Sequence, residues 1–179
     1  MKINTPLTKN KISRLNVGDI VYLSGTVYTG RDLAHKRLND SLNNSEELAF
    51  ELSNQTIFYT GPTPNRDHQV IGSCGPTTSY RMDDLTNLLL DKGLSAMIGK
   101  GERNQNVINK IKETGAVYFI SIGGVAALTS ECIKEAQIIC YEDLGPEAIR
   151  KLEVEDMKLI VAIDSKGNTI FENYKKYMR

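Results

Sequence analysis

The 179-residue chain has no tryptophan, two histidines, three cysteines and no surplus of charge of either sign. Its 22 Lys and Arg residues equal its 22 Asp and Glu residues, so we do not expect binding to nucleic acid, which needs a basic surface. No apolar run approaches the roughly 20 residues that span a bilayer, since residues 117–128 are interrupted by Ser121 and by Gly123-Gly124. Residues 1–6 lack the apolar segment of a signal peptide. These absences predict a soluble, cytoplasmic protein with no membrane partner.

The cysteines do not form a recognisable framework. Cys74, Cys132 and Cys140 are odd in number, and no two of them have the CxxC spacing. With only His35 and His68 in addition, a closed metal site within this chain is not expected. We expect free thiols in a reducing compartment, with a cluster ligand at Cys74 as the alternative.

Length and composition are those of an ordinary globular domain. A chain of 179 residues is close to the roughly 150 residues of a typical domain, so we expect residues 1–179 to form one domain. The expected strands, which are β-branched and aromatic, cover residues 20–28, 57–60, 94–98, 116–122, 137–141 and 159–164, the last joined by a turn to 169–171; the expected helices cover 32–42, 77–91, 104–113 and 126–136. Alternating helices and strands predict an α/β fold with a parallel or mixed sheet. The first sixty residues have fewer helices and are expected to add a separate β layer.

The most unusual segment is residues 71–83, IGSCGPTTSYRMD. A Gly-Pro pair ahead of hydroxyl residues predicts a helix start, whose free backbone N–H groups can hold a carboxylate or phosphate. Thr77 and Arg81 are four positions apart and would lie on one helix face, where a guanidinium can grip a carboxylate at two points. The alternative is a capped helix in which Arg81 forms a structural ion pair. The local residues do not decide between the two.

A second candidate segment is residues 28–37, where a strand ends and a helix begins. Arg31 lies at that junction, a place where ligands bind in α/β folds. Asp32 suits the first turn of a helix because its charge complements the helix dipole. His35 is either a proton carrier or, as is commoner for a single helical histidine, a structural residue.

A third candidate is Lys100 in residues 98–103, which follows an expected strand and is flanked by glycines. The spacing of a complete phosphate-binding loop is absent, but the ammonium is well placed for the mouth of a site. Together with Arg31, Arg81 and a threonine hydroxyl, Lys100 would form a pocket for a small dianion. No carboxylate pair, Ser-His-Asp set or cofactor motif accompanies these residues, so we expect a partner chain to supply the rest of the site.

Taken in order, these segments resemble the β subunit of class I iron–sulfur hydro-lyases, the fumarate hydratases and L-tartrate dehydratases. The matching stretches are GTVYTGRDLAHKR (25–37), FYTGPTP (58–64), IGSCGPTTSYRMDDL (71–85), IGKG (98–101), IGGVAAL (122–128) and LIVAIDSKGN (159–168). The resemblance implies a swivelling β/β/α domain with mixed sheets, which in single-chain members is the C-terminal domain. Two departures are Cys74 ahead of GPTTS and an insert-like segment at residues 39–54.

The resemblance also implies roles for individual residues. Arg31, Lys100 and Thr78 would bind the substrate. Thr77 would be the base that takes the C3 proton of malate, although a threonine hydroxyl is a poor base without activation. Arg81 would bind substrate and provide that activation through its positive charge.

Support for these groups would come from Asp32 and His35. The resemblance implies no metal ligand and no cofactor in this chain. It implies instead a partner α subunit, whose three cysteines hold a [4Fe–4S] cluster with one iron open to substrate. That iron would act as a Lewis acid on the leaving hydroxyl, and the partner would supply the general acid.

The activity implied is the reversible hydration of fumarate to L-malate, in a homo- or hetero-oligomer that includes the α subunit. Dehydration of L(+)-tartrate to oxaloacetate is the alternative within the same class. A second alternative, from a different class, is a non-catalytic carboxylate-binding module.

Overall fold

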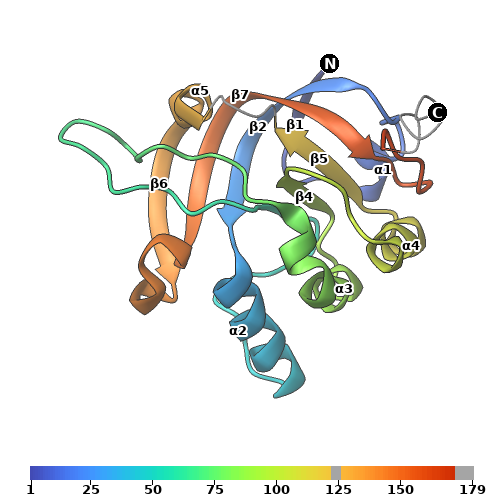
Figure 1. Cartoon of the computed structure of the whole chain (residues 1–179), viewed down its shortest axis with the longest axis horizontal. Helices are drawn as coiled ribbons and strands as arrows, with labels where there is room; N and C mark the ends of the chain where they lie inside the picture. The colour runs from blue at the N-terminus through green and yellow to red at the C-terminus, as the bar shows by residue number, and fades with distance from the viewer. Residues whose placement is uncertain (122–125, 172–179) are drawn as a thin grey trace, which may run out of the picture.

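The computed structural model describes residues 1–121 and 126–171 (Figure 1). Its strands are β1 (Lys2–Asn4), β2 (Ile20–Thr29), β3 (Thr56–Phe58), β4 (Ala96–Gly99), β5 (Val117–Ser121), β6 (Ile133–Cys140) and β7 (Ile149–Ile163). Its α-helices are α1 (Lys9–Ile12), α2 (Asp32–Asn43), α3 (Asp83–Asp91), α4 (Gln105–Thr114) and α5 (Ala126–Glu131), and its 3₁₀ turns are η1 (Ser79–Met82) and η2 (Glu142–Glu147). The predicted α/β class is confirmed.

All of these strands belong to one mixed sheet, in the order β1-β2-β3-β4-β5-β7-β6. Strands β2, β3, β4 and β5 are parallel neighbours, whereas β7 runs antiparallel to β2, β5 and β6. Because β7 pairs with both β2 and β5, the sheet closes on itself into a small barrel. The expectation of a separate β layer in the first sixty residues is therefore wrong, since β1, β2 and β3 are part of the same sheet.

The central strands are buried on both faces, and their side chains alternate between two apolar cores. Phe58, Ile98 and Phe119 belong to the core inside the barrel. Their neighbours Met97 and Tyr118 point the other way, into the core between the sheet and the helices. Burial on both sides explains why these strands appear in the sequence as continuous apolar runs.

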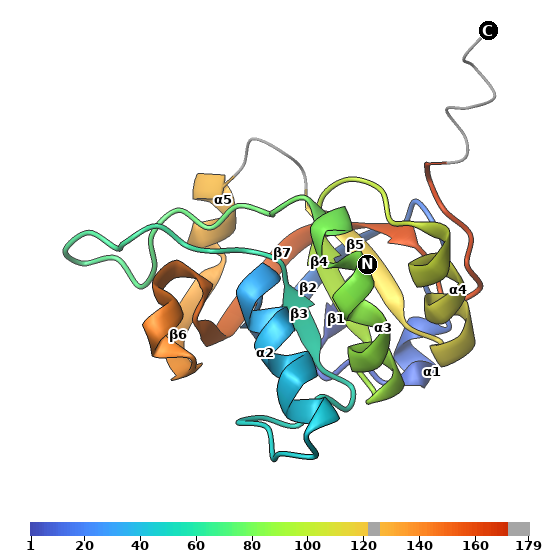
Figure 2. The ribbon, with the colours of Figure 1, turned by 60° about the horizontal axis from the view of Figure 1, so that its bottom comes forward.

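Helices α2, α3 and α4 lie side by side on one outer face of the barrel (Figure 2). Helix α4 lies within one residue of the predicted range 104–113, because residues at both of its ends favour a helix boundary. The Asn104 side chain accepts a hydrogen bond from the Val107 N–H at 2.9 Å, and Gly115 ends the helix in the left-handed conformation. No helix in the described ranges is long and apolar enough to cross a membrane.

The predicted helix over 77–91 is wrong in its first six residues. The α-helix begins only at Asp83 and is preceded by η1, with Thr78 in an extended conformation. Thr78 instead forms a parallel bridge with Lys100, and the Ser79 N–H donates to the Lys100 carbonyl at 2.9 Å. Pairing with the end of β4 satisfies the backbone that a helix would otherwise satisfy.

The predicted helix over 126–136 is also too long, because β6 begins at Ile133. Its partner β7 begins ten residues earlier than expected, at Ile149. The apolar side chains of β7 change phase between Val154 and Met157, where Asp156 has a positive φ and the register with β2 shifts. This bulge interrupts the alternation that marks a strand in the sequence. The turn after β7 is confirmed, with Gly167 at positive φ.

Candidate functional site

The parallel strands bring several predicted residues to one edge of the sheet. Arg31 follows the end of β2, and Lys100 follows the end of β4 directly. In α/β sheets ligands bind outside the carboxyl ends of such strands. The glycine-rich junction after β5, residues 122–125, lies outside the described residues.

Arg31 and Arg81 meet at one carboxylate. Asp32 Oδ1 lies 2.9 Å from Arg81 Nε, and Asp32 Oδ2 lies 3.8 Å from Arg31 Nη2. Two sequence motifs separated by about fifty residues are therefore joined by Asp32. Within the described residues, Asp32 Oδ2 and Arg31 Nε are buried and make no hydrogen bond. Buried polar atoms are nearly always paired, so this cluster is chemically incomplete.

Glu147 completes the surroundings of Arg31 and was missed by the sequence reasoning. Its Oε2 accepts a hydrogen bond from the Leu33 N–H at 2.9 Å, which caps the start of α2, and its Oε1 lies 3.7 Å from Arg31 Nη2. Gly61 packs against the same guanidinium, and a Cβ there would lie only 2.9 Å from Arg31 Nη1. Glu147 is more than a hundred residues away in sequence and has no local pattern that would have revealed it.

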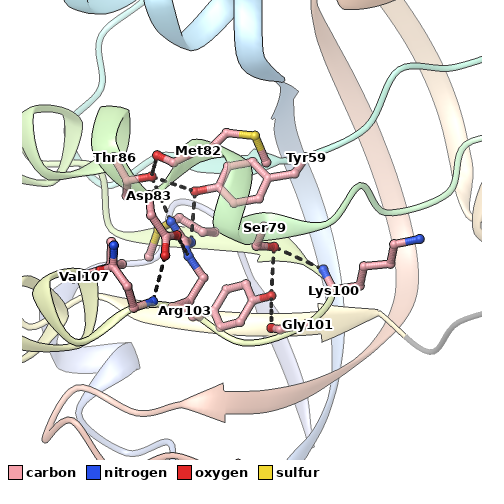
Figure 3. A network of polar contacts seen from close by, with 12 residues as sticks. Tyr59, Ser79, Met82, Asp83, Thr86, Lys100, Gly101, Arg103 and Val107 are labelled. Carbon is pink, nitrogen blue, oxygen red and sulfur yellow. Dashed lines mark hydrogen bonds and ion pairs between the residues drawn. The ribbon is translucent and has the colours of Figure 1, made fainter.

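Thr77, Thr78 and Lys100 form a second group at the same edge. The Thr77 N–H donates to the Tyr59 carbonyl at 2.6 Å, and Thr78 pairs with Lys100 through the parallel bridge. The Lys100 N–H donates to Ser79 Oγ at 3.1 Å. Figure 3 shows the Lys100 ammonium pointing away from the buried side chains, and it makes no ion pair with any described residue.

The expected relation between Thr77 and Arg81 is corrected. They do not share a face of an α-helix, because Thr77 precedes the 3₁₀ turn that contains Arg81. The Arg81 guanidinium pairs with Asp32, so the ion pair considered as an alternative is present. The Thr77 hydroxyl makes no hydrogen bond in the described part of the chain, and activation of Thr77 by Arg81 stays a prediction.

His35 supports the backbone of the site. Its side chain is completely buried, its Nδ1 lies 2.9 Å from the Arg31 carbonyl oxygen, and its ring packs edge-on against Tyr59. Burial lowers the pKa of His35 to about 4, so the ring is neutral at pH 7 and donates from Nδ1. This geometry favours the structural alternative over proton transfer to a ligand.

A buried network that the sequence reasoning did not identify lies behind these loops (Figure 3). Arg103 Nε lies 2.5 Å from Asp83 Oδ1, and its other nitrogens donate to Thr86 Oγ1 at 2.8 Å and to the Tyr59 hydroxyl at 3.2 Å. The side chains of Arg103 and Asp83 are 0% and 4% exposed. The only available sequence signal was that Asp83 ends the RMD motif and Arg103 follows the IGKG motif.

A cavity of about 460 Å³ lies beside this edge of the sheet. It is lined by residues of the loop 62–72, by β6 and by Arg150, and its lining does not include Arg31, Thr77, Arg81 or Lys100. The predicted site residues therefore form two contact groups, one around Asp32 and one around Lys100, which residues 79–80 connect. Both groups lie outside this cavity.

The described residues do not fit an iron–sulfur cluster. They contain no group of three or more His, Cys, Asp or Glu side chains arranged to hold a metal ion. Cys74 is buried, which raises the pKa of its thiol to about 11, and its sulfur lies 3.4 Å from Thr60 Oγ1. Cys132 and Cys140 are half-buried at the two ends of β6.

Comparison with known proteins extends over nearly the whole chain. The family described as Fumarase C-terminus matches residues 1–174. A putative L(+)-tartrate dehydratase subunit beta from Methanocaldococcus jannaschii is 40% identical over 176 residues, covering 95% of this chain and 90% of that protein. The aerobic class I fumarate hydratase of Escherichia coli is 37% identical over 174 residues, and fumarate hydratase 2 of Leishmania major is 36% identical over 165 residues. The chain spans 32% and 29% of those two enzymes. It therefore belongs to the fumarase C-terminus family, whose matched relatives carry the names of hydro-lyases.

Proposed function

We propose that this chain is the β subunit of a hydro-lyase that reversibly hydrates fumarate to L-malate, together with an α subunit that carries a [4Fe–4S] cluster. The observation that carries the proposal is the joining of Arg31 and Arg81 by Asp32, with buried polar atoms that make no hydrogen bond to the described residues. The family match supports the same reading. The chain spans about a third of the matched fumarate hydratase of Escherichia coli, and our proposal assigns the remaining functions of such an enzyme to the α subunit.

Charge supports a dicarboxylate as the ligand. Fumarate and malate are dianions, and a guanidinium binds a carboxylate through two parallel hydrogen bonds. Three cations, Arg31, Arg81 and Lys100, lie at this edge against two carboxylates, Asp32 and Glu147. Arg81 is 45% exposed and Lys100 is exposed, so both can reach a bound ligand.

In this proposal, Arg31, Arg81, Lys100 and Thr78 hold the substrate carboxylates. Thr77 takes the C3 proton of malate in its ionised alkoxide form, which positive charge from the arginines would stabilise relative to the neutral hydroxyl. The α subunit supplies the cluster, the general acid and the remaining wall of the site. Asp32 and His35 hold the two arginine-bearing segments in place.

Tartrate dehydration is the second candidate. It is favoured by one observation: the Methanocaldococcus jannaschii relative named as a tartrate dehydratase subunit is a β chain of similar length. L(+)-Tartrate has a second hydroxyl group, which would need one more hydrogen-bonding partner.

The test is steady-state kinetics on the purified α–β complex. We expect hydration of fumarate that depends on both subunits, with kcat/KM for malate above that for tartrate. The reverse order would make the enzyme a tartrate dehydratase. Tight fumarate binding without turnover of either substrate would indicate a binding module, and turnover by this chain alone without iron would contradict the two-subunit proposal.

A further inference from the structure

The Arg103 side chain carries a charge that is buried behind the candidate site. It is 0% exposed, so it cannot touch a ligand at the sheet edge. Burying a charge is costly unless it is paired and hydrogen-bonded. Arg103 meets that condition through Asp83, Tyr59 and Thr86, and its guanidinium carbon lies 5.3 and 5.2 Å from the ring centroids of Tyr59 and Tyr118.

Asp83 joins the starts of two helices. One carboxylate oxygen accepts from Arg103 Nε, and the other accepts from the Asn104 N–H at 2.7 Å. Asp83 is the first residue of α3, and Asn104 is the N-cap of α4. The carboxylate therefore links η1, which contains Arg81 and follows Thr77 and Thr78, to the segment that follows Lys100.

Ser79 and Tyr118 form a second link between the same two segments. Tyr118 Oη lies 2.8 Å from Ser79 Oγ and 2.9 Å from the Gly101 carbonyl, while Ser79 Oγ accepts from the Lys100 N–H. Burial raises the pKa of Tyr118, so its hydroxyl stays protonated and can donate. The segments approach so closely that a Cβ on Gly99 would lie 1.9 Å from Ser79 Oγ. The first glycine of the IGKG motif is therefore required by packing.

We propose that the Asp83–Arg103 pair, with Ser79 and Tyr118, is a positioning device that holds residues 77–81 and 99–103 as one rigid unit. None of its four members is proposed to touch the substrate. The consequence for catalysis rests on the proposed function: the candidate base Thr77 and the candidate cation Lys100 keep their relative positions only while the device is intact. A displacement of about 1 Å in such groups can cost on the order of a hundredfold in rate.

Two variants test the proposal. Arg103→Lys keeps the charge but loses the planar set of donors, and Ser79→Ala removes one link without leaving an unpaired charge. Lys110→Met is the matched control, because Lys110 and Asp91 form a surface ion pair between the same helices, α3 and α4.

The first readout is amide hydrogen exchange on the full chain, which does not depend on activity. We expect exchange in residues 77–81 and 99–103 to become at least about tenfold faster in both test variants, with β7 and α2 unchanged. The control should exchange like wild type in all four regions. Unchanged exchange in both segments, or acceleration in one segment only, would overturn the rigid-unit proposal even if the complex proved inactive. If Arg103→Lys fails to fold, the Ser79→Ala result decides.

The second readout is kinetics of the α–β complex. We expect kcat to fall at least about tenfold in the test variants, with KM changed by no more than about threefold because the substrate-binding side chains are still present. Faster exchange with unchanged kcat would overturn the positioning role. If wild-type complex shows no hydro-lyase activity, the proposed function fails while the exchange result still stands.

Discussion

Two polar clusters lie at the same edge of the sheet, and they differ in completeness. The Asp83–Arg103 network is buried, and its charged atoms are all hydrogen-bonded. The Arg31–Asp32–Arg81 cluster is half-exposed and contains buried polar atoms that make no hydrogen bond to the described residues. A satisfied buried network rigidifies the structure and has no capacity left for a ligand. An unsatisfied cluster with exposed cations has that capacity, which is why we propose positioning for the first and substrate binding for the second.

We expect the largest loss of stability when the buried, fully hydrogen-bonded Asp83–Arg103 network is broken. Arg103→Met should lower the free energy of unfolding by about 3–5 kcal/mol, because it leaves the Asp83 carboxylate buried and unpaired. Urea denaturation measures this change. Lys110→Met, at the surface pair between the same helices, should leave the midpoint close to that of wild type. Equal effects of the two variants would mean that burial does not distinguish these ion pairs.

His35, which contacts the Arg31 backbone next to the incomplete cluster, should make stability depend on pH. The pKa of His35 is lowered from 6.5 to about 4 in the folded chain. The folded state therefore binds this proton less well than the unfolded state, so stability is complete above pH 6.5 and declines as pH falls to about 4. Between pH 6.5 and about 4, the free energy of unfolding should therefore fall by on the order of 3 kcal/mol because of His35.

Unfolding by urea at a series of pH values between 7 and 4 measures the effect of His35. His35→Gln should flatten the decline in this interval, whatever its effect at pH 7. His68→Gln, at an exposed position, is the matched control and should keep the wild-type slope. A slope that is the same in all three chains would show that His35 protonation is not linked to folding.

Removing a cation from the incomplete cluster should affect turnover more than folding. Arg81→Ala in the α–β complex should lower kcat by roughly a hundredfold or more, as expected for a lost charged contact in the transition state. Arg37→Ala, which removes a surface ion pair with Asp143, should leave kcat within about twofold of wild type. Near-normal turnover of the Arg81 variant would remove Arg81 from the proposed mechanism.

The smallest effect is expected at Glu147. Glu147→Ala removes the cap at the start of α2 and should lower the free energy of unfolding by about 1 kcal/mol. It should also raise KM a few-fold, because Arg31 loses a carboxylate that holds it in place. Glu142→Ala, in the same 3₁₀ segment, controls for a lost surface charge. Thermal or urea unfolding together with steady-state kinetics separates the two effects, and a KM equal to wild type would contradict a role in orienting Arg31.

The sequence predicted elements whose ends carry local markers. Helix α4 has its asparagine cap and terminal glycine, and the turn after β7 has Gly167. The first half of β7 has no clear strand pattern because the bulge at Asp156 breaks the alternation. Residues 77–82 are not α-helical because Thr78 pairs with Lys100, some twenty residues away. Closure of the barrel by β2 and β7 is likewise a long-range pairing without a local pattern.

The same limit applies to the site. Arg31, Arg81 and Lys100 were predicted as candidates from motifs at element ends, and the structure shows how Asp32 connects the first two. The contribution of Glu147 and the Asp83–Arg103 pair depends on side chains that meet only after the chain has folded. Such contacts leave no periodicity or spacing in a single sequence.

The central claim is that the incomplete cluster receives a dicarboxylate. The most direct measurement is the structure of the α–β complex with L-malate bound. We predict that one substrate carboxylate lies within hydrogen-bonding distance of the Arg31 or Arg81 guanidinium and the other near Lys100. Malate bound elsewhere, with all three of these side chains facing solvent, would contradict the account.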